Sequence, residues 1–205
     1  MKRLLIIMMI AVVAHAFGQE NKEGGEKRTI AAIANGYESI AWGTKLSDAR
    51  DKIKGKLVFS DDRTKIISRD GDLEYYYGFF YVDPALAGAA EKKEAEAQPA
   101  DSEKVDEGTL FYVALKFPYL SMEEVRKKIE DRYGPSTNEN LHKMQGAIAW
   151  NGESTIIIMW VDRYENRPFC RRITYIDKKI TRELSEYQFK VFNKVELAIL
   201  KQLGI

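Results

Sequence analysis

A short charged segment occurs twice in this 205-residue chain, and the duplication constrains the fold more than any other feature. KLSDARDKI, at 45–53, aligns with SMEEVRKKI, at 121–129, and acidic, basic and apolar residues match between the two copies. Apolar residues recur at helical spacing in each copy. Each copy therefore predicts a short helix that buries one face.

Capping signals define the ends of these helices. Ser121 and Glu124 have the spacing of a capping box, in which the serine hydroxyl accepts a hydrogen bond from the backbone of the third helical residue. Gly134 then tolerates a left-handed turn, and Pro135 cannot continue the helix. We expect Gly55 to end the first helix in a similar way.

Two β-like runs, rich in aromatic and β-branched residues, follow each helix. The predicted strands are Leu73–Val82 and Thr109–Phe117 after the first helix, and Ser154–Val161 and Phe169–Ile176 after the second. Ala147–Trp150, followed by Asn151-Gly152, indicates a further strand that ends in a hairpin turn.

These elements predict an α+β fold class within a domain at 29–205. Tandem helix–strand–strand repeats, at about 40–118 and 119–177, would share an antiparallel sheet with both helices on one face. A polar, alanine-rich loop at 84–108 interrupts the first half, and its composition predicts disorder. A long C-terminal helix at 181–203 would place on one face Leu184, Tyr187, Val191, Val195, Ala198 and Ile199.

The first sixteen residues have the three-part layout of a secretory signal peptide. Lys2 and Arg3 precede the apolar run Leu4–Val13, and Ala14-His15-Ala16 forms a small-x-small cleavage site. Such an apolar run is too short to cross a bilayer. We therefore expect a periplasmic or secreted protein with no transmembrane segment after cleavage, and a flexible stretch at 17–28.

The composition of the chain excludes several kinds of binding and catalytic site. The formal net charge is +1, which gives no electrostatic reason to bind nucleic acid. Beyond the predicted signal peptide the chain has one histidine, His142, and one cysteine, Cys170, too few for a zinc site built on these residues. No phosphate-binding glycine loop occurs. We therefore predict no metal, no cofactor and no catalytic residues.

Acidic pairs allow two interpretations. Asp61-Asp62, and Asp70 with Asp72 around Gly71, suggest calcium binding or paired-carboxylate chemistry. A turn before Leu73 explains the second pair more simply, because glycine and aspartate favour turns. A carboxylate-based hydrolase remains the competing functional class.

The aromatic run YYYGFFY is the main candidate for binding. Period-two alternation places Tyr75, Tyr77, Phe79 and Tyr81 on one face of a strand. Together with Tyr112 from the neighbouring strand, these side chains would form an exposed face for a protein segment or a sugar ring. In the alternative, the C-terminal helix covers this face and both sides of the sheet are core.

The corner Trp42-Gly43-Thr44, followed by Asp48-Ala49 and Ile53, resembles the opening of a diffuse group of uncharacterised exported bacterial α+β proteins. The second copy is similar to the later half of that group, at Glu124-Val125, Tyr133-Gly134-Pro135, Trp150 and Thr155–Ile158. The helix–Gly–Pro pattern more distantly resembles modules of the outer-membrane assembly lipoprotein BamE and of the β-lactamase inhibitor protein. The resemblance implies binding or scaffold work in the envelope.

We therefore expect a non-enzymatic, exported binding or assembly protein of the bacterial cell envelope with a protein partner. The partner would contact the aromatic face or the C-terminal helix, and that helix is also the candidate surface for self-association. A periplasmic enzyme inhibitor, with the 84–108 loop ordering on its target, is a further alternative. We interpret the corner at Trp42 as structural, with the Trp42 side chain filling the junction between sheet and helix.

Overall fold

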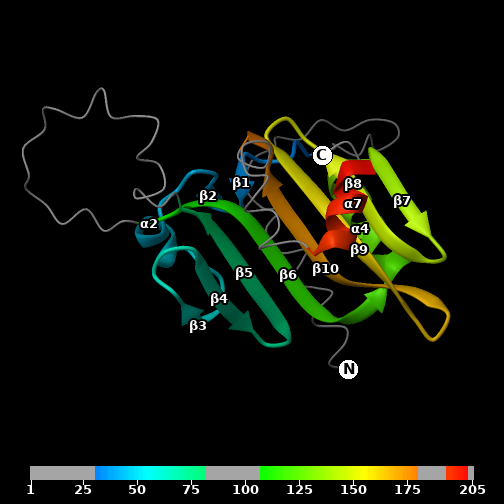
Figure 1. Cartoon of the computed structure of the whole chain (residues 1–205), viewed down its shortest axis with the longest axis horizontal. Helices are drawn as coiled ribbons and strands as arrows, with labels where there is room; N and C mark the ends of the chain where they lie inside the picture. The colour runs from blue at the N-terminus through cyan, green and yellow to red at the C-terminus, as the bar shows by residue number, and fades with distance from the viewer. Residues whose placement is uncertain (1–30, 82–106, 180–192, 203–205) are drawn as a thin grey trace, which may run out of the picture. The chain divides into compact units, whose positions relative to one another are not determined.

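The computed structural model describes residues 31–81, 107–179 and 193–202 (Figure 1). The predicted signal peptide (1–16), the polar stretch (17–28) and most of the 84–108 loop lie outside these residues. The described elements are β1 (Gly36–Tyr37), β2 (Ile40–Ala41), α2 (Leu46–Arg50), β3 (Lys56–Ser60), β4 (Lys65–Asp70), β5 (Leu73–Phe80), β6 (Thr109–Ser121), α4 (Met122–Tyr133), β7 (Asn138–His142), β8 (Gln145–Asn151), β9 (Thr155–Tyr164), β10 (Arg167–Asp177) and α7 (Lys194–Gln202).

The fold is mostly β, and the predicted α+β class is wrong. Eight strands form one antiparallel sheet in the order β3-β4-β5-β6-β10-β9-β8-β7, and β1 pairs separately with β2 (Figure 1). The predicted helix–strand–strand unit is also wrong, because each of α2 and α4 is followed by four strands. These two four-stranded meanders meet where β6 pairs with β10.

The two helices differ in how well their ends were predicted. Ser121 is the N-cap of α4, and its hydroxyl accepts a hydrogen bond from the Glu124 backbone at 3.5 Å. Gly134, with φ of +84°, ends this helix as expected. Helix α2 has only five residues, starts after Lys45 without a side-chain cap, and ends well before Gly55.

The C-terminal helix is shorter than predicted. Helix α7 comprises nine residues, Lys194–Gln202, while residues 181–192 and 203 of the predicted helix lie outside the described part of the chain. Val195, expected on the buried stripe, is 70% exposed. Ile199 does pack against the sheet, so α7 contacts the core through part of the predicted face.

Apolar side chains are buried on both faces of the sheet. Successive side chains of each strand point to opposite faces, so the same strands contribute to two separate clusters. On the first face, α2 and α4 cover the sheet with Leu46, Ala49, Val125 and Ile129. On the second face, a separate cluster of side chains from β6, β8, β9 and β10 meets Ile199 of α7. Burial on both faces explains why β9 is an almost continuous apolar run.

The corner at Trp42 is part of the first face. Its ring packs against the core there, and its Nε1 donates a hydrogen bond to Thr155 Oγ1 at 2.7 Å. Gly43 has φ of +81°, and its amide donates to the Leu110 carbonyl at 2.9 Å. The Thr44 hydroxyl donates back to the Ala41 carbonyl, so it closes the turn and does not cap α2.

Candidate binding surface

The predicted aromatic site residues of β5 lie in the core. Tyr75, Tyr77 and Phe79 are buried on the face that the short helices cover. The Tyr77 hydroxyl accepts a hydrogen bond from the Lys54 amide at 3.0 Å, and the Tyr75 and Tyr77 rings stack at 6.3 Å between centroids. Burial raises the pKa of Tyr75 to about 12, and the nearby Glu38 carboxylate adds to this effect.

The remaining two predicted residues lie elsewhere. Tyr112 is buried in the cluster on the second face, where burial raises its pKa to about 12. Tyr81 is half-buried beyond the end of β5, with the Arg63 guanidinium 5.8 Å from its ring centroid. The five residues therefore do not form one exposed face, and the alternative in which both faces are core describes β5 and β6 better.

An exposed group of aromatic rings does exist, at the far ends of the central strands. We call Tyr119, Tyr164 and Phe169 the aromatic cluster. Tyr119 and Tyr164 are 42% and 50% exposed, and their rings stack at 5.3 Å with 17° between planes. Phe169 meets both rings edge-on, at 6.1 and 6.2 Å. Three adjoining rings thus form a surface that is partly open to solvent.

Strand pairing places these three rings together. Tyr119 lies near the end of β6, and Phe169 of β10 pairs with Ser121 of β6 on one side and with Asp162 of β9 on the other. Tyr164 pairs with Arg167 beside the two-residue turn between β9 and β10. Both turn residues have positive φ, the conformation of tight hairpin turns, so this tip is compact.

Arg171 completes this end of the sheet. Its guanidinium lies 5.3 Å from the Tyr119 ring centroid, and its Nη1 donates to the Tyr119 hydroxyl at 3.2 Å. That hydrogen bond raises the pKa of Arg171. Arg171, Tyr119 and Tyr164 thus form an exposed stack of one cation and two phenol rings.

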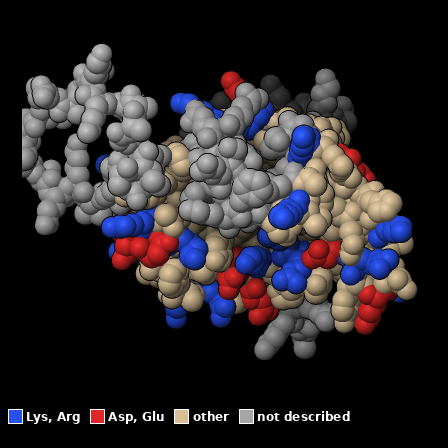
Figure 2. Space-filling view, in the orientation of Figure 1, with Lys and Arg blue, Asp and Glu red and all other residues tan. Residues whose placement is uncertain are grey.

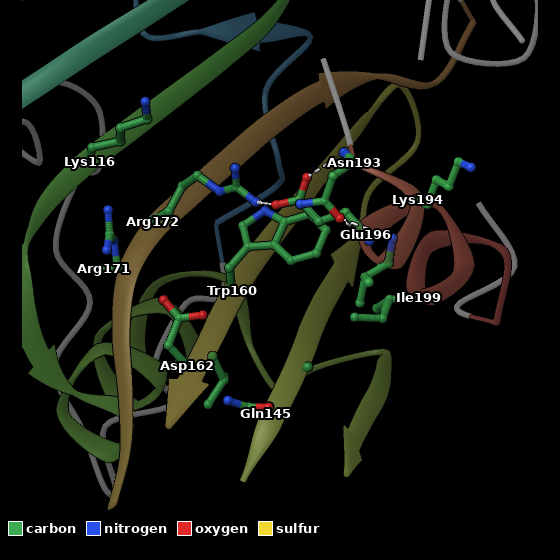
Figure 3. A pocket seen from close by; sticks show the side chains of 13 residues that line it. Lys116, Gln145, Trp160, Asp162, Arg171, Arg172, Asn193, Lys194, Glu196 and Ile199 are labelled. Atoms are coloured by element: carbon green, nitrogen blue, oxygen red, sulfur yellow. Dashed lines mark hydrogen bonds and ion pairs between the residues drawn. The ribbon is translucent and has the colours of Figure 1, made fainter. Parts of the chain in front are cut away.

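A pocket of about 720 Å³ lies on the second face, between the sheet and α7 (Figure 3). Trp160 of β9 lies at its centre, Ile199 of α7 borders it, and Asp162 and Arg171 extend its lining toward the aromatic cluster. Arg171 belongs both to the pocket lining and to the stack on Tyr119, so the two features are continuous. We refer to the Trp160 pocket and the aromatic cluster together as the arginine–aromatic surface.

Two arginine contacts organise the pocket. Arg172 forms an ion pair with Glu196 of α7, and its guanidinium lies 4.6 Å from the Trp160 ring centroid (Figure 3). The Trp160 Nε1 donates to Thr174 Oγ1 at 2.9 Å. These contacts hold the indole ring and the first turn of α7 in place, so this part of the pocket is preorganised.

The charges on this surface are mixed. Lys116, Arg171, Arg172 and Lys194 line the pocket together with Asp162 and Glu196. In Figure 2, lysine, arginine and acidic side chains are interspersed over the part of this face that is coloured. Such a surface suits a ligand with aromatic and polar groups better than a polyanion, which would require a continuous basic area.

Other candidate residues have structural positions. Cys170 is fully buried in β10, and burial raises the pKa of its thiol to about 12. His142 is exposed at the end of β7. Asp61 accepts hydrogen bonds from the backbone of Arg63, Thr64 and Lys65, which identifies it as a turn residue. Within the described ranges, no three residues among His, Cys, Asp and Glu are grouped as metal ligands.

Comparisons with known proteins give no relative. No family model matches the chain, and neither a curated protein nor a solved structure is significantly similar to it. Among the helices that the structure describes, none combines the length and the apolar character needed to span a membrane.

The sequence held signals for the arginine–aromatic surface that our prediction did not use. The predicted strand Thr109–Phe117 stops two residues before Tyr119, and the predicted strand Ser154–Val161 stops three residues before Tyr164. Extending the first strand by two residues and the second by three would have placed both tyrosines at the same end of the sheet as Phe169.

Proposed function

We propose that this protein is a non-enzymatic binding or assembly protein of the bacterial cell envelope. It is exported to the periplasm or secreted, and it engages a protein partner through the arginine–aromatic surface. The single observation that carries this proposal is the exposed stack of Arg171, Tyr119 and Tyr164.

Tyrosine, tryptophan and arginine are the side chains that contribute most to binding free energy at protein interfaces. Tyr119 and Tyr164 offer wide apolar rings that lose little rotamer entropy on binding. Their mutual stacking, and the Arg171 contact, limit their motion before a partner arrives. Trp160 and its pocket lie beside them and would accept a protruding side chain of the partner.

Site-specific photo-crosslinking in cells tests the proposal. A photoreactive phenylalanine analogue replaces Tyr164, and a matched control carries it at Lys127 on the exposed side of α4. We expect a discrete crosslinked product of defined mass at position 164 and not at position 127. Combining it with Tyr119→Ala should remove the product, while circular dichroism shows that the protein stays folded.

Two results would refute the proposal. The same products at both positions would mean that the arginine–aromatic surface has no preferred partner. Recovery of the protein in the cytosolic fraction of its native host, with its first sixteen residues still attached, would contradict an envelope location.

A further inference from the structure

Strand β3 forms one edge of the eight-stranded sheet and exposes an unusual amount of apolar surface. Leu57, Val58 and Phe59 are 50%, 55% and 45% exposed, and they are consecutive. Three of the seven large hydrophobic side chains found exposed in the described part of the chain thus lie in one five-residue strand. Within the described residues, only β4 pairs with β3.

The opposite edge of the sheet looks different. Strand β7 has the sequence NENLH, and its Glu139 forms an ion pair with Arg126 of α4. Asn140 is hydrogen-bonded to Gln202 of α7. Polar and charged residues of this kind protect a sheet edge from pairing with another chain. The one charged residue of β3 is Lys56 at its start, so the three apolar residues that follow it lack this protection.

A bulge modifies β3 without hiding it. The pairing with β4 shifts between Leu57 and Phe59, so Val58 is the extra residue in the ladder. Leu57 lies opposite the buried Ser68, and Phe59 lies opposite Ile67, with Lys65 Nζ at 5.0 Å from the phenyl ring centroid. The exposed side chains therefore extend to both faces at the edge, where an added strand would cover them.

We propose that β3 is a self-association edge, at which two copies of this protein pair their β3 strands antiparallel about a two-fold axis near Val58. The charges around the strand support a second copy as the occupant. Lys56 begins the strand and Asp61 follows its end, whereas the neighbouring Lys54 and Asp62 form ion pairs within the chain, with Glu38 and Arg50. Antiparallel pairing brings the basic end of each copy to the acidic end of the other, whereas parallel pairing would oppose like charges.

A two-fold interface repeats every contact, so this single strand supplies both halves of the complementary surface. With Val58 at the axis, Leu57 of one copy lies beside Phe59 of the other, and both pairs leave water. Strands this short bury less area than a stable interface usually requires. The dimer is therefore weak, and its population depends on concentration. This inference is independent of the proposed function, which uses another surface.

Disulfide trapping tests the pairing. Directly opposed residues of antiparallel strands have Cα atoms about 4.5–5.5 Å apart, within the range that a disulfide spans. Val58→Cys should therefore give a covalent dimer under mild oxidation of the purified protein. Met144→Cys is the matched control, since Met144 is 48% exposed but lies in the turn between β7 and β8. Cys170 is buried in both variants.

Sedimentation velocity over a concentration series gives a second readout. Lys56→Asp should raise the dimer dissociation constant roughly two- to tenfold, because it turns two symmetry-related attractions at the surface into repulsions. Lys143→Asp, in the same turn as Met144, should leave the dissociation constant unchanged. Together the two charge variants separate a specific pairing from a general effect of net charge.

Three outcomes would overturn the proposal. The first is equal crosslinking of the Val58→Cys and Met144→Cys variants. The second is a combination of two results: the unmodified protein stays monomeric at every concentration, and the thiol of the Val58→Cys variant is reactive. The edge would then be open to a different partner. The third is a monomer in which that thiol is unreactive, which would mean that another segment of the same chain covers β3.

Discussion

Replacing Trp150 by phenylalanine tests the idea that the second meander is locked to α4 by one indole ring. Trp150 is 1% exposed, and its Nε1 donates to the carbonyl of Gly134, the C-cap of α4, at 3.0 Å. Phenylalanine keeps most of the ring but cannot donate. The substitution therefore removes a hydrogen bond between β8 and the end of the helix, and leaves a small void.

Both losses can be estimated from the structure. The buried Gly134 carbonyl loses its indole partner, which costs about 1–3 kcal/mol. The void of roughly 40 Å³ costs about 1 kcal/mol more, at about 24 cal/mol per Å³. We expect the Trp150→Phe variant to lose about 2–4 kcal/mol of unfolding free energy, measured by urea denaturation followed by circular dichroism.

Trp42→Phe is the matched control. Trp42 is only partly buried, and its acceptor, Thr155 Oγ1, keeps the hydrogen bond that it donates to the Ala34 carbonyl. The loss should be about 1 kcal/mol, the net contribution of an ordinary hydrogen bond. A loss below about 0.5 kcal/mol for Trp150→Phe, or equal losses for the two variants, would refute the argument.

Three further predictions concern stability. Burial raises the pKa of Tyr112 to about 12, so the tyrosine ionises in the unfolded state first as the pH rises above 10. The unfolding free energy should therefore fall from pH 10 toward pH 12. In pH-dependent urea titrations, Tyr112→Phe should reduce this fall by up to about 3 kcal/mol, and an unchanged slope would contradict the prediction. Gly146→Ala should lower the unfolding free energy by about 3 kcal/mol, since φ is +143° and a Cβ would lie 1.9 Å from the Asn140 carbonyl oxygen. Gly43→Ala should lower it by only about 1 kcal/mol, because φ there is +81° but the space around a Cβ is open. A larger loss for Gly43→Ala than for Gly146→Ala would be evidence against this geometry. Ser121→Ala should lower the thermal midpoint through loss of about 1 kcal/mol of N-cap stabilisation, whereas an unchanged midpoint would show that the cap contributes nothing.

The sequence was sufficient for the strands that are buried on both faces. Strands β5, β6, β9 and β10 contain dense aromatic and β-branched runs, so their positions were predicted with errors mainly at the ends. Strand β7, with the sequence NENLH, has little intrinsic strand preference and owes its conformation to pairing with β8. Strands β3 and β4 contain only three and two consecutive apolar residues, Leu57–Phe59 and Ile66-Ile67, which is a weak strand signal. Without these three strands, the sheet was underestimated and the fold class was wrong.

The binding surface depends on information that no short window of sequence contains. Tyr119 and Phe169 are fifty positions apart and meet only because β6 pairs with β10 in one register. The prediction therefore favoured YYYGFFY, the densest local aromatic run, which the structure places in the core. Local density of aromatic residues cannot distinguish a buried strand from a binding face, because both require large apolar rings.

The pairing of β6 with β10 has a consequence for the order of folding. Within each meander the strands are neighbours in sequence and are joined by short turns, apart from the β5–β6 connection, so most contacts form between nearby residues. The β6–β10 ladder must instead close a loop that contains α4 and three strands, and loop closure of this kind slows folding. We therefore expect stopped-flow refolding to be limited by the meeting of these two central strands. Substitutions at their interface would then alter the refolding rate more than substitutions at the outer hairpins.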